Sequence, residues 1–185
     1  MPSFILALDT AHQRCSAALL SRDGEVSAWK SETVGNKHAE RILAMIDELL
    51  AECGAEKKDI ALTAFGAGPG SFTGLRIGLS AVKGMAHALG KGCVGVSTLE
   101  ALAWNLSGMD AAVCPVLDAR CSQVYTALFR SGGDFPERLA DDEAVSLSAL
   151  EERLKKFGER VFLVGDGAET LGPWPNMRDT PSGGY

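Results

Sequence analysis

Glycines, a proline and two hydroxyl side chains gather in one stretch that could bind an anion. It runs from Gly66 to Gly78 with the sequence Gly-Ala-Gly-Pro-Gly-Ser-Phe-Thr-Gly-Leu-Arg-Ile-Gly. Glycine lets the backbone approach a ligand closely, and Ser71 or Thr73 can cap a helix whose dipole attracts negative charge. The stretch lacks the Gly-Lys-Ser/Thr of a P-loop and the third glycine of a dinucleotide-binding turn. A tight strand-to-helix corner without a ligand is the alternative.

Asp9 is the acidic side chain best placed to act with this corner. It follows the apolar run 4–8 and opens a short polar loop that ends at Ser16. Such a hairpin binds phosphate in the actin-like, sugar-kinase and heat-shock ATPase superfamily, and a carboxylate at a strand end could hold hydrated magnesium. A plain hairpin loop is the alternative.

No complete catalytic or metal-binding set accompanies Asp9 in the sequence. The histidines, His12, His38 and His87, lack the spacing of a helical metal pair. No serine lies in a Gly-x-Ser-x-Gly turn, and no cysteine belongs to a Cys-x-x-Cys pair. We therefore predict no catalytic residue and no metal ligand.

The elements that position these residues alternate between strands and helices. Apolar runs and turn residues predict strands at 4–8, 15–20, 25–32, 60–65 and 93–96, and helical periodicity predicts helices at 37–53 and 72–89. A capping pattern, Ser97-Thr-Leu-Glu100, precedes a further helical run. This order indicates a mixed sheet with helices packed on it, in a first lobe of residues 1–107.

The pattern restarts near Gly108 and predicts a second, smaller lobe at residues 108–185. Strands are expected at 112–117, 123–129 and 161–164, with a helix at 149–157. These elements repeat the order of strand, hairpin, helix and strand seen in the first lobe. The predicted fold class is therefore α/β with two lobes, each a mixed sheet flanked by helices.

Composition indicates a reduced, intracellular protein. The chain has 185 residues, a formal net charge of −6 and five scattered cysteines. An acidic balance guarantees no basic face for nucleic acid, and an odd number of unpaired cysteines suits a reducing compartment. Because the sequence has neither a basic leader nor an apolar run of membrane-spanning length, we predict a cytoplasmic protein without membrane contact.

The helix at 72–89 carries small residues at near-helical spacing: Gly74, Gly78, Ala81, Gly84 and Ala88. Each glycine costs a helix about 1 kcal/mol relative to alanine, so these glycines indicate close packing, most simply against another helix. The helix at 37–53 has a wide apolar face as well. We predict that these two helices form the centre of a homodimer.

Several of these motifs together resemble a known family. The run from Gly68 to Gly78 is accompanied by Asp9-Thr10, His38-Ala-Glu-Arg-Ile42, Gly95-Val-Ser-Thr-Leu99 and Asp118-Ala-Arg120. This set is similar to the TsaB (YeaZ) family of bacterial tRNA threonylcarbamoyladenosine biosynthesis proteins. The resemblance implies an actin-like, heat-shock ATPase-like (ribonuclease H-like) fold of two lobes. It also implies a non-catalytic role beside the related protein TsaD, which carries the metal and transfers the threonylcarbamoyl group to tRNA.

The resemblance also sets expectations for partners and cofactors. It implies binding to a TsaD-like paralogue and a TsaE-like ATPase, a homodimer when alone, and only indirect contact with tRNA. The isolated chain is expected to hold no cofactor, while ATP or ADP with magnesium could be shared at a partner interface. Gln123 replaces the family's usual glutamate, and the second lobe is expected to be truncated relative to the family. A stand-alone ATP- or metal-dependent enzyme, either a kinase-like phosphotransferase or a glycoprotease-type peptidase, is the alternative.

Two sets of site residues follow. The polar loop and the glycine corner would form a vestigial nucleotide-like cradle of Asp9, Thr10, Ser16, Gly68, Gly70, Ser71 and Thr73. The two long helices would form a partner or dimer surface of His38, Ile42, Met45, Gly74, Arg76, Gly78, Ala81, Val82 and Met85.

Overall fold

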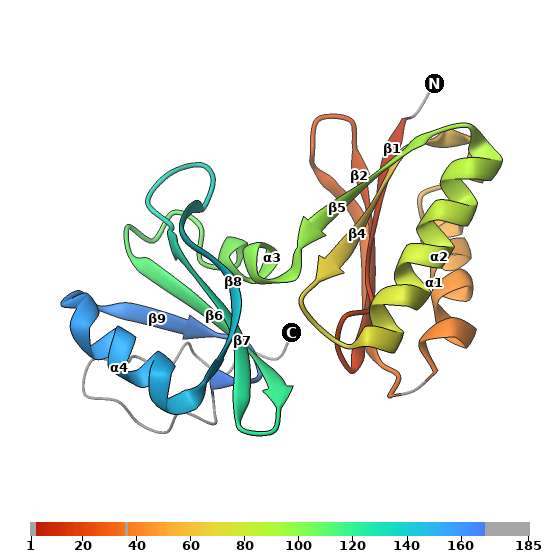
Figure 1. Cartoon of the computed structure of the whole chain (residues 1–185). Coiled ribbons are helices and arrows are strands. Elements are labelled where there is room, and N and C mark those ends of the chain that lie inside the picture. Colours follow the sequence, from red (N-terminus) through yellow and green to blue (C-terminus); the bar gives the residue numbers. More distant parts are fainter. Residues whose placement is uncertain (1–2, 36, 169–185) are drawn as a thin grey trace. The chain divides into compact units, whose positions relative to one another are not determined.

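The chain folds into two units, which the computed structural model describes over residues 3–35 and 37–168 (Figure 1). The first unit is Met1–Ser97 and the second is Thr98–Tyr185. The division falls ten residues before the boundary expected from sequence, because helix α3 (Thr98–Trp104) packs with the second unit. Leu99 and Ala103 of α3 are buried there against Val113 and Phe129.

The first unit is a five-stranded mixed sheet in the order β3-β2-β1-β4-β5. Its strands are β1 (Phe4–Asp9), β2 (Arg14–Ser21), β3 (Val26–Thr33), β4 (Ile60–Gly68) and β5 (Gly92–Ser97). The first three strands are antiparallel, whereas β4 runs parallel to β1 and β5 runs parallel to β4. The predicted strands are therefore confirmed, and β4 extends into the glycine-rich stretch as far as Gly68.

Two long helices, α1 (His38–Glu52) and α2 (Phe72–Leu89), cover the same face of this sheet (Figure 1). A short 3₁₀ turn, η1 (Lys57–Asp59), leads from α1 into β4. Ser71 caps α2 by accepting a hydrogen bond from the Gly74 amide, and Gly90 ends the helix in the left-handed conformation. Both ends of α2 lie where the sequence predicts them.

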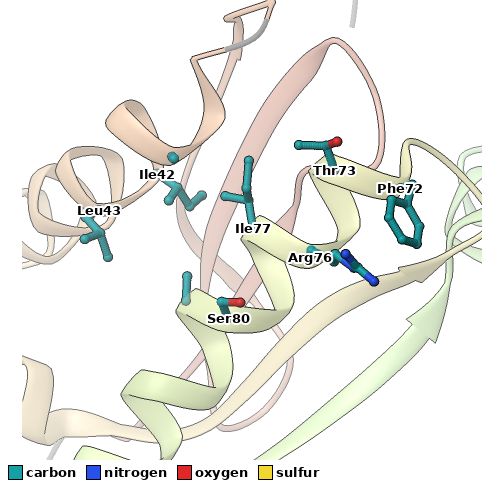
Figure 2. A pocket seen from close by; sticks show the side chains of 9 residues that line it. Ile42, Leu43, Phe72, Thr73, Arg76, Ile77 and Ser80 are labelled. Atoms are coloured by element: carbon teal, nitrogen blue, oxygen red, sulfur yellow. The ribbon is translucent and has the colours of Figure 1, made fainter.

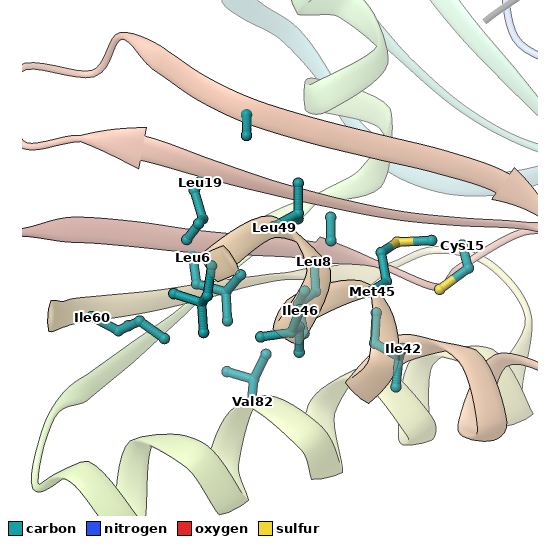
Figure 3. Close-up of a cluster of buried hydrophobic side chains, with 13 residues drawn as sticks. Leu6, Leu8, Cys15, Leu19, Ile42, Met45, Ile46, Leu49, Ile60 and Val82 are labelled. Atoms are coloured by element: carbon teal, nitrogen blue, oxygen red, sulfur yellow. The ribbon is translucent and has the colours of Figure 1, made fainter. Parts of the chain in front are cut away.

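Leucines that alternate along β1 and β2 meet the apolar faces of both helices in one core (Figure 3). Leu6 and Leu8 of β1 and Leu19 of β2 are buried. They pack with Ile46 of α1 and Val82 of α2 in the same cluster. Because strand side chains alternate between faces, this core explains the period-two pattern of the opening strands.

The second unit repeats the topology of the first with fewer elements. Its sheet has the order β8-β7-β6-β9, built from β6 (Ala112–Arg120), β7 (Gln123–Arg130), β8 (Glu137–Ser146) and β9 (Val161–Val164). Helix α4 (Leu147–Phe157) connects β8 to β9, as α1 connects β3 to β4. β9 pairs parallel to β6, as β4 pairs parallel to β1. The predicted repeat is therefore present in the structure.

Strand β8 was not predicted from the sequence. It carries Arg138, Asp141, Asp142 and Glu143, charged residues that are unusual in a strand. Its position at the edge of the sheet leaves these side chains in contact with water, and its backbone pairs with β7. This long-range pairing stabilises a strand that local propensity does not indicate.

The glycines of α2 have two different environments. A Cβ atom at Gly74 would overlap the backbone oxygen of Thr10, and a Cβ atom at Gly78 would overlap the Thr10 hydroxyl. Nothing lies within 4 Å of a Cβ atom at Gly84. Gly74 and Gly78 therefore allow the loop between β1 and β2 of the same unit to approach α2 closely. The expectation that these two glycines pack against a partner helix is wrong.

These environments predict opposite effects of alanine at two positions of one helix. Gly84→Ala should raise the free energy of unfolding by about 0.5–1 kcal/mol, because alanine is the better helix former and has open space there. Gly78→Ala should lower it by about 1–3 kcal/mol, because the new methyl group forces Thr10 away from α2. Urea unfolding followed by circular dichroism measures both changes. Equal effects at the two positions would contradict this packing.

Candidate functional site

The loop between β1 and β2 closes tightly on the glycine corner. The Asp9 carboxylate accepts a hydrogen bond from the Ala11 amide at 2.8 Å. The Ala11 carbonyl accepts from the Ser71 amide at 2.7 Å. The Thr10 hydroxyl, buried in the unit, donates to the Gly74 carbonyl at 2.8 Å. The structure thus brings Asp9, Thr10 and Ser71 together through contacts within the chain.

The polar groups of this cradle are engaged within the chain. A Cβ atom at Gly70 would lie 2.7 Å from the Ala11 carbonyl oxygen, so the loop between β1 and β2 already fills the space beside this glycine. The Ser16 hydroxyl lies 2.8 Å from that of Ser31 on the adjacent strand. Gly68 has a left-handed φ of 105°, as the sharp exit from β4 requires. The residues present therefore do not fit a nucleotide phosphate in this arrangement.

Thr73 lies apart from the cradle, on a groove between α1 and α2 (Figure 2). The groove has a volume of about 550 Å³. It is lined by side chains of both helices, most of them small or apolar, together with one arginine: Ala39, Ile42, Leu43, Phe72, Thr73, Arg76, Ile77, Ser80 and Ala81. Two of its large apolar side chains are exposed, Leu43 to 55% and Phe72 to 68%.

Arg76 provides the positive charge of this groove. Its guanidinium lies 3.8 Å from the centroid of the Phe72 ring, in a cation–π contact (Figure 2). The contact restricts both side chains on one turn of α2 and leaves the Arg76 charge exposed at the surface. An apolar groove with one pre-oriented arginine suits a protein partner, since arginine and aromatic residues are enriched at interfaces.

The structure corrects much of the partner surface that we predicted on these helices. Six of its residues are buried within the chain itself: His38, Ile42, Met45, Gly74, Gly78 and Val82. Of these, Ile42 forms part of the groove wall, at 2% exposure. Ala81 and Met85 are half-buried, and Arg76 is exposed. The apolar periodicity of each helix identified the side that packs on the unit's own sheet.

The exposed groove residues that we did not predict lie one helical position away from the predicted ones. Leu43 follows Ile42 on α1, and Phe72 begins α2 beside its Ser71 cap. Leu43 belongs to the wide apolar face of the helix at 37–53, at its exposed margin, and Phe72 precedes the apolar residues that recur along α2. The width of the one face and the position of Phe72 before the other are the signals by which the sequence could have identified them.

An ion-pair network holds α1 to the edge strand β3. Arg41 of α1 binds both carboxylate oxygens of Glu32 at 2.7 Å and one oxygen of Glu48 at 2.6 Å. Lys30 of β3 binds Glu48 at 2.9 Å. Hydrogen bonds from Arg41 and then from Lys30 lower the pKa of Glu48 from 4.5 to about 2. The network fixes the outer side of the helix whose inner side faces the core.

Other candidate chemistry is limited in the part of the chain that the structure describes. No three histidine, cysteine, aspartate or glutamate side chains come together there as a metal site requires. In the second unit, the Asp118 carboxylate accepts a hydrogen bond from the Arg120 amide at 2.7 Å, which shapes the turn between β6 and β7. None of the described helices is both long and apolar enough to cross a membrane.

Comparison with known proteins finds a family profile and relatives that all carry names from the biosynthesis of one modified tRNA nucleoside. A family profile described as "TsaD: tRNA N6-adenosine threonylcarbamoyltransferase" matches residues 31–162. The Escherichia coli protein named "tRNA threonylcarbamoyladenosine biosynthesis protein TsaB" is 36% identical over 177 residues, which cover 94% of this chain and 74% of that protein. The Bacillus subtilis protein of the same name is 34% identical, with coverage of 87% and 70%.

Solved structures agree with these sequence matches. The structure described as "YeaZ from Pseudomonas aeruginosa" superposes with a TM-score of 0.80 at 30% identity, over 96% of this chain and 84% of that chain. The ethanolamine utilization protein EutJ from Carboxydothermus hydrogenoformans shares the fold alone, with a TM-score of 0.50 at 16% identity.

The repeated units and these structural matches define an α/β protein of the actin-like class, as the sequence predicts. Within that class, the chain belongs to the TsaD-like family and groups with its relatives named TsaB. The resemblance found in the sequence motifs is thereby confirmed.

The lowered pKa of Glu48 predicts how the first unit responds to acid. A carboxyl group whose pKa falls on folding stabilises the folded state above its unfolded pKa of about 4.5, and this stabilisation is lost as the pH falls towards about 2. Glu48→Gln should therefore reduce stability at pH 7 and have a smaller effect near pH 2.5. The network is partly exposed, so the effect is modest and falls with added salt.

Urea unfolding between pH 7 and pH 2.5 measures this dependence. The control is Glu152→Gln, which changes an exposed glutamate of α4. A pH profile that is the same for both variants would show that the Arg41 network does not stabilise the fold.

Proposed function

We propose that this chain is the non-catalytic scaffold or activator subunit of the complex that forms N6-threonylcarbamoyladenosine at position 37 of tRNAs reading codons that begin with A. Its relatives are named as biosynthesis proteins for this nucleoside, and the matching family profile is described as the transferase. The catalytic partner is a TsaD-like paralogue, a TsaE-like ATPase joins them, and tRNA is contacted only indirectly. The complex works in the cytoplasm.

The groove between α1 and α2 is the observation that carries this proposal. Leu43 on α1 and Phe72 on α2 expose apolar surface at opposite ends of the groove, and Arg76 adds a pre-oriented charge beside Phe72 (Figure 2). Burying such a surface against another helix pair removes apolar area from water and leaves the arginine to pair with an acidic group. A binding surface of this kind suits a subunit that acts by holding a partner.

The same groove accounts for self-association when no partner is present. The outward residues of α1 include Glu40, whereas those of α2 include Arg76 and Lys83, all exposed. In a two-fold dimer, α1 of one copy can face α2 of the other, so that acidic and basic residues meet. We infer a homodimer that gives way to the heteromeric complex, because both would use one surface.

A non-catalytic role also agrees with the cradle. Asp9, Thr10 and Ser71 engage one another or the neighbouring backbone, and the chain occupies the space beside Gly70. A kinase-like enzyme would need these groups for phosphate and metal. We infer that the isolated chain holds no nucleotide, and that ATP or ADP with magnesium binds only where a partner completes the site.

Disrupting the groove should abolish function without unfolding the chain. Leu43→Asp places a charge where a leucine would be buried by a partner, a loss of about 1.5–3 kcal/mol in binding, or roughly tenfold to hundredfold in affinity. The matched control is Leu139→Asp, which changes an exposed leucine of β8. The measurement is the threonylcarbamoyladenosine content of tRNA, by mass spectrometry, in cells that depend on this chain. If the Leu43→Asp variant supports the same threonylcarbamoyladenosine content as the parent protein, the groove is not the functional surface.

The rival function, a stand-alone ATP-dependent enzyme, predicts different behaviour of the purified chain. We expect no ATP hydrolysis above background and no ATP binding at micromolar concentration by calorimetry with magnesium present, because the cradle is closed by its own hydrogen bonds. Turnover that is abolished by Asp9→Asn would establish the enzyme and overturn the scaffold. A peptidase assay on unfolded casein tests the other form of the rival.

A further inference from the structure

The loop between β1 and β2 is bonded to both helices that form the groove. The Thr10 hydroxyl donates to the Gly74 carbonyl of α2 at 2.8 Å. The next residue, Ala11, accepts from the amide of Ser71, the cap of α2, at 2.7 Å. The residue after that, His12, offers its carbonyl oxygen to Nε2 of His38, the first residue of α1, at 2.7 Å. Three consecutive residues thus connect one loop to two helices.

These bonds are made at the ends of the helices that carry the groove. His38 precedes Ala39 and Leu43 on the first two turns of α1, and the Ser71 cap precedes Phe72 and Arg76 on the first two turns of α2. Core contacts hold both helices along their length, including those of Ile42 and Leu49 on α1 and of Val82 on α2. At the N-terminal ends, beside the groove, the loop adds hydrogen bonds to both helices. The separation of the helices at the groove therefore depends on the loop to which both are anchored.

We propose that His38 and Thr10 are positioning residues that set the width of the partner groove through the loop between β1 and β2. The proposal rests on the groove's being the partner surface. His38 is 6% exposed and Thr10 is 3% exposed, so neither side chain presents surface to a partner. Because a carbonyl oxygen only accepts, Nε2 of His38 carries the proton in this bond. Each residue acts on binding through the helix that it anchors.

Paired variants separate the hydrogen bond from the volume of the side chain. His38→Met removes the donor and keeps an apolar side chain of similar length, whereas His38→Gln keeps an N–H group near the position of Nε2. Thr10→Val removes the hydroxyl, whereas Thr10→Ser keeps it. The matched control is Thr126→Val, which removes a threonine hydroxyl of equal burial from the core of the second unit.

The first measurement is self-association by sedimentation velocity, at a temperature where every variant is fully folded. His38→Met and Thr10→Val should weaken it about tenfold, while His38→Gln, Thr10→Ser and Thr126→Val should stay within about twofold of the parent. A role in stability alone would lower the melting temperature of Thr10→Val and Thr126→Val alike, and would leave the affinity of the folded protein unchanged.

The second measurement needs no partner. Spin labels at Leu43→Cys and Ser80→Cys, on the exposed sides of α1 and α2, report the separation of the helices by pulsed electron resonance. The background replaces the accessible cysteines Cys53, Cys93 and Cys121 with serine. The distance distribution should broaden or shift in His38→Met and Thr10→Val, and should match the parent in Thr126→Val.

The outcomes distinguish the two proposals. Unchanged distances and unchanged affinity in both His38→Met and Thr10→Val overturn the positioning role. If Leu43→Asp leaves association intact, the groove is not the partner surface and the proposed function fails in that respect. In that case the label distances still decide whether the loop sets the separation of the helices.

Discussion

Close contact between Thr10 and the first two turns of α2 is the constraint on which the first unit depends. Thr10 follows β1, the central strand of the sheet, and its hydroxyl bonds the Gly74 carbonyl. Such an approach requires that neither Gly74 nor Gly78 has a Cβ atom. Two glycines cost the helix about 2 kcal/mol relative to alanine, and the packing of sheet against helix offsets that cost. The position of α2, and with it one wall of the groove, follows from this contact.

Much of the fold could be predicted because its signals are local. Apolar runs define β1 and β4, and Ser71 and Gly90 define the ends of α2 through capping chemistry that involves only neighbouring residues. Strand β8 could not be predicted, because its charged residues are tolerated only through pairing with β7 at a sheet edge. The strand propensity of a segment's own residues does not show whether a distant segment of the chain will pair with it.

The candidate site could be predicted by element and only in part by residue, because Ile42, Arg76 and Ala81 line the groove but most of the other predicted residues are buried. The sequence identified α1 and α2, yet apolar periodicity marks any buried face and does not distinguish the unit's own sheet from another protein. Met45 and Val82 therefore looked like partner residues, although both are fully buried here. Leu43 and Phe72 are exposed because they lie at the margins of the helix faces that pack on the sheet. Only the position of the sheet beneath the helices separates these two sets.

The loop between β1 and β2 is held by hydrogen bonds to both helices, and some of these bonds use backbone amides that could otherwise bind an anion. The amide of Ala11 donates a hydrogen bond to the Asp9 carboxylate, and the amide of Ser71 donates one to the Ala11 carbonyl. An anion that bound either amide would have to displace a bond that holds the loop or the start of α2. Such a displacement in the isolated chain would loosen the loop that is bonded to both α1 and α2. In the isolated chain, the hydrogen bonds that hold this loop and the start of α2 therefore use the same amides that a bound phosphate would need.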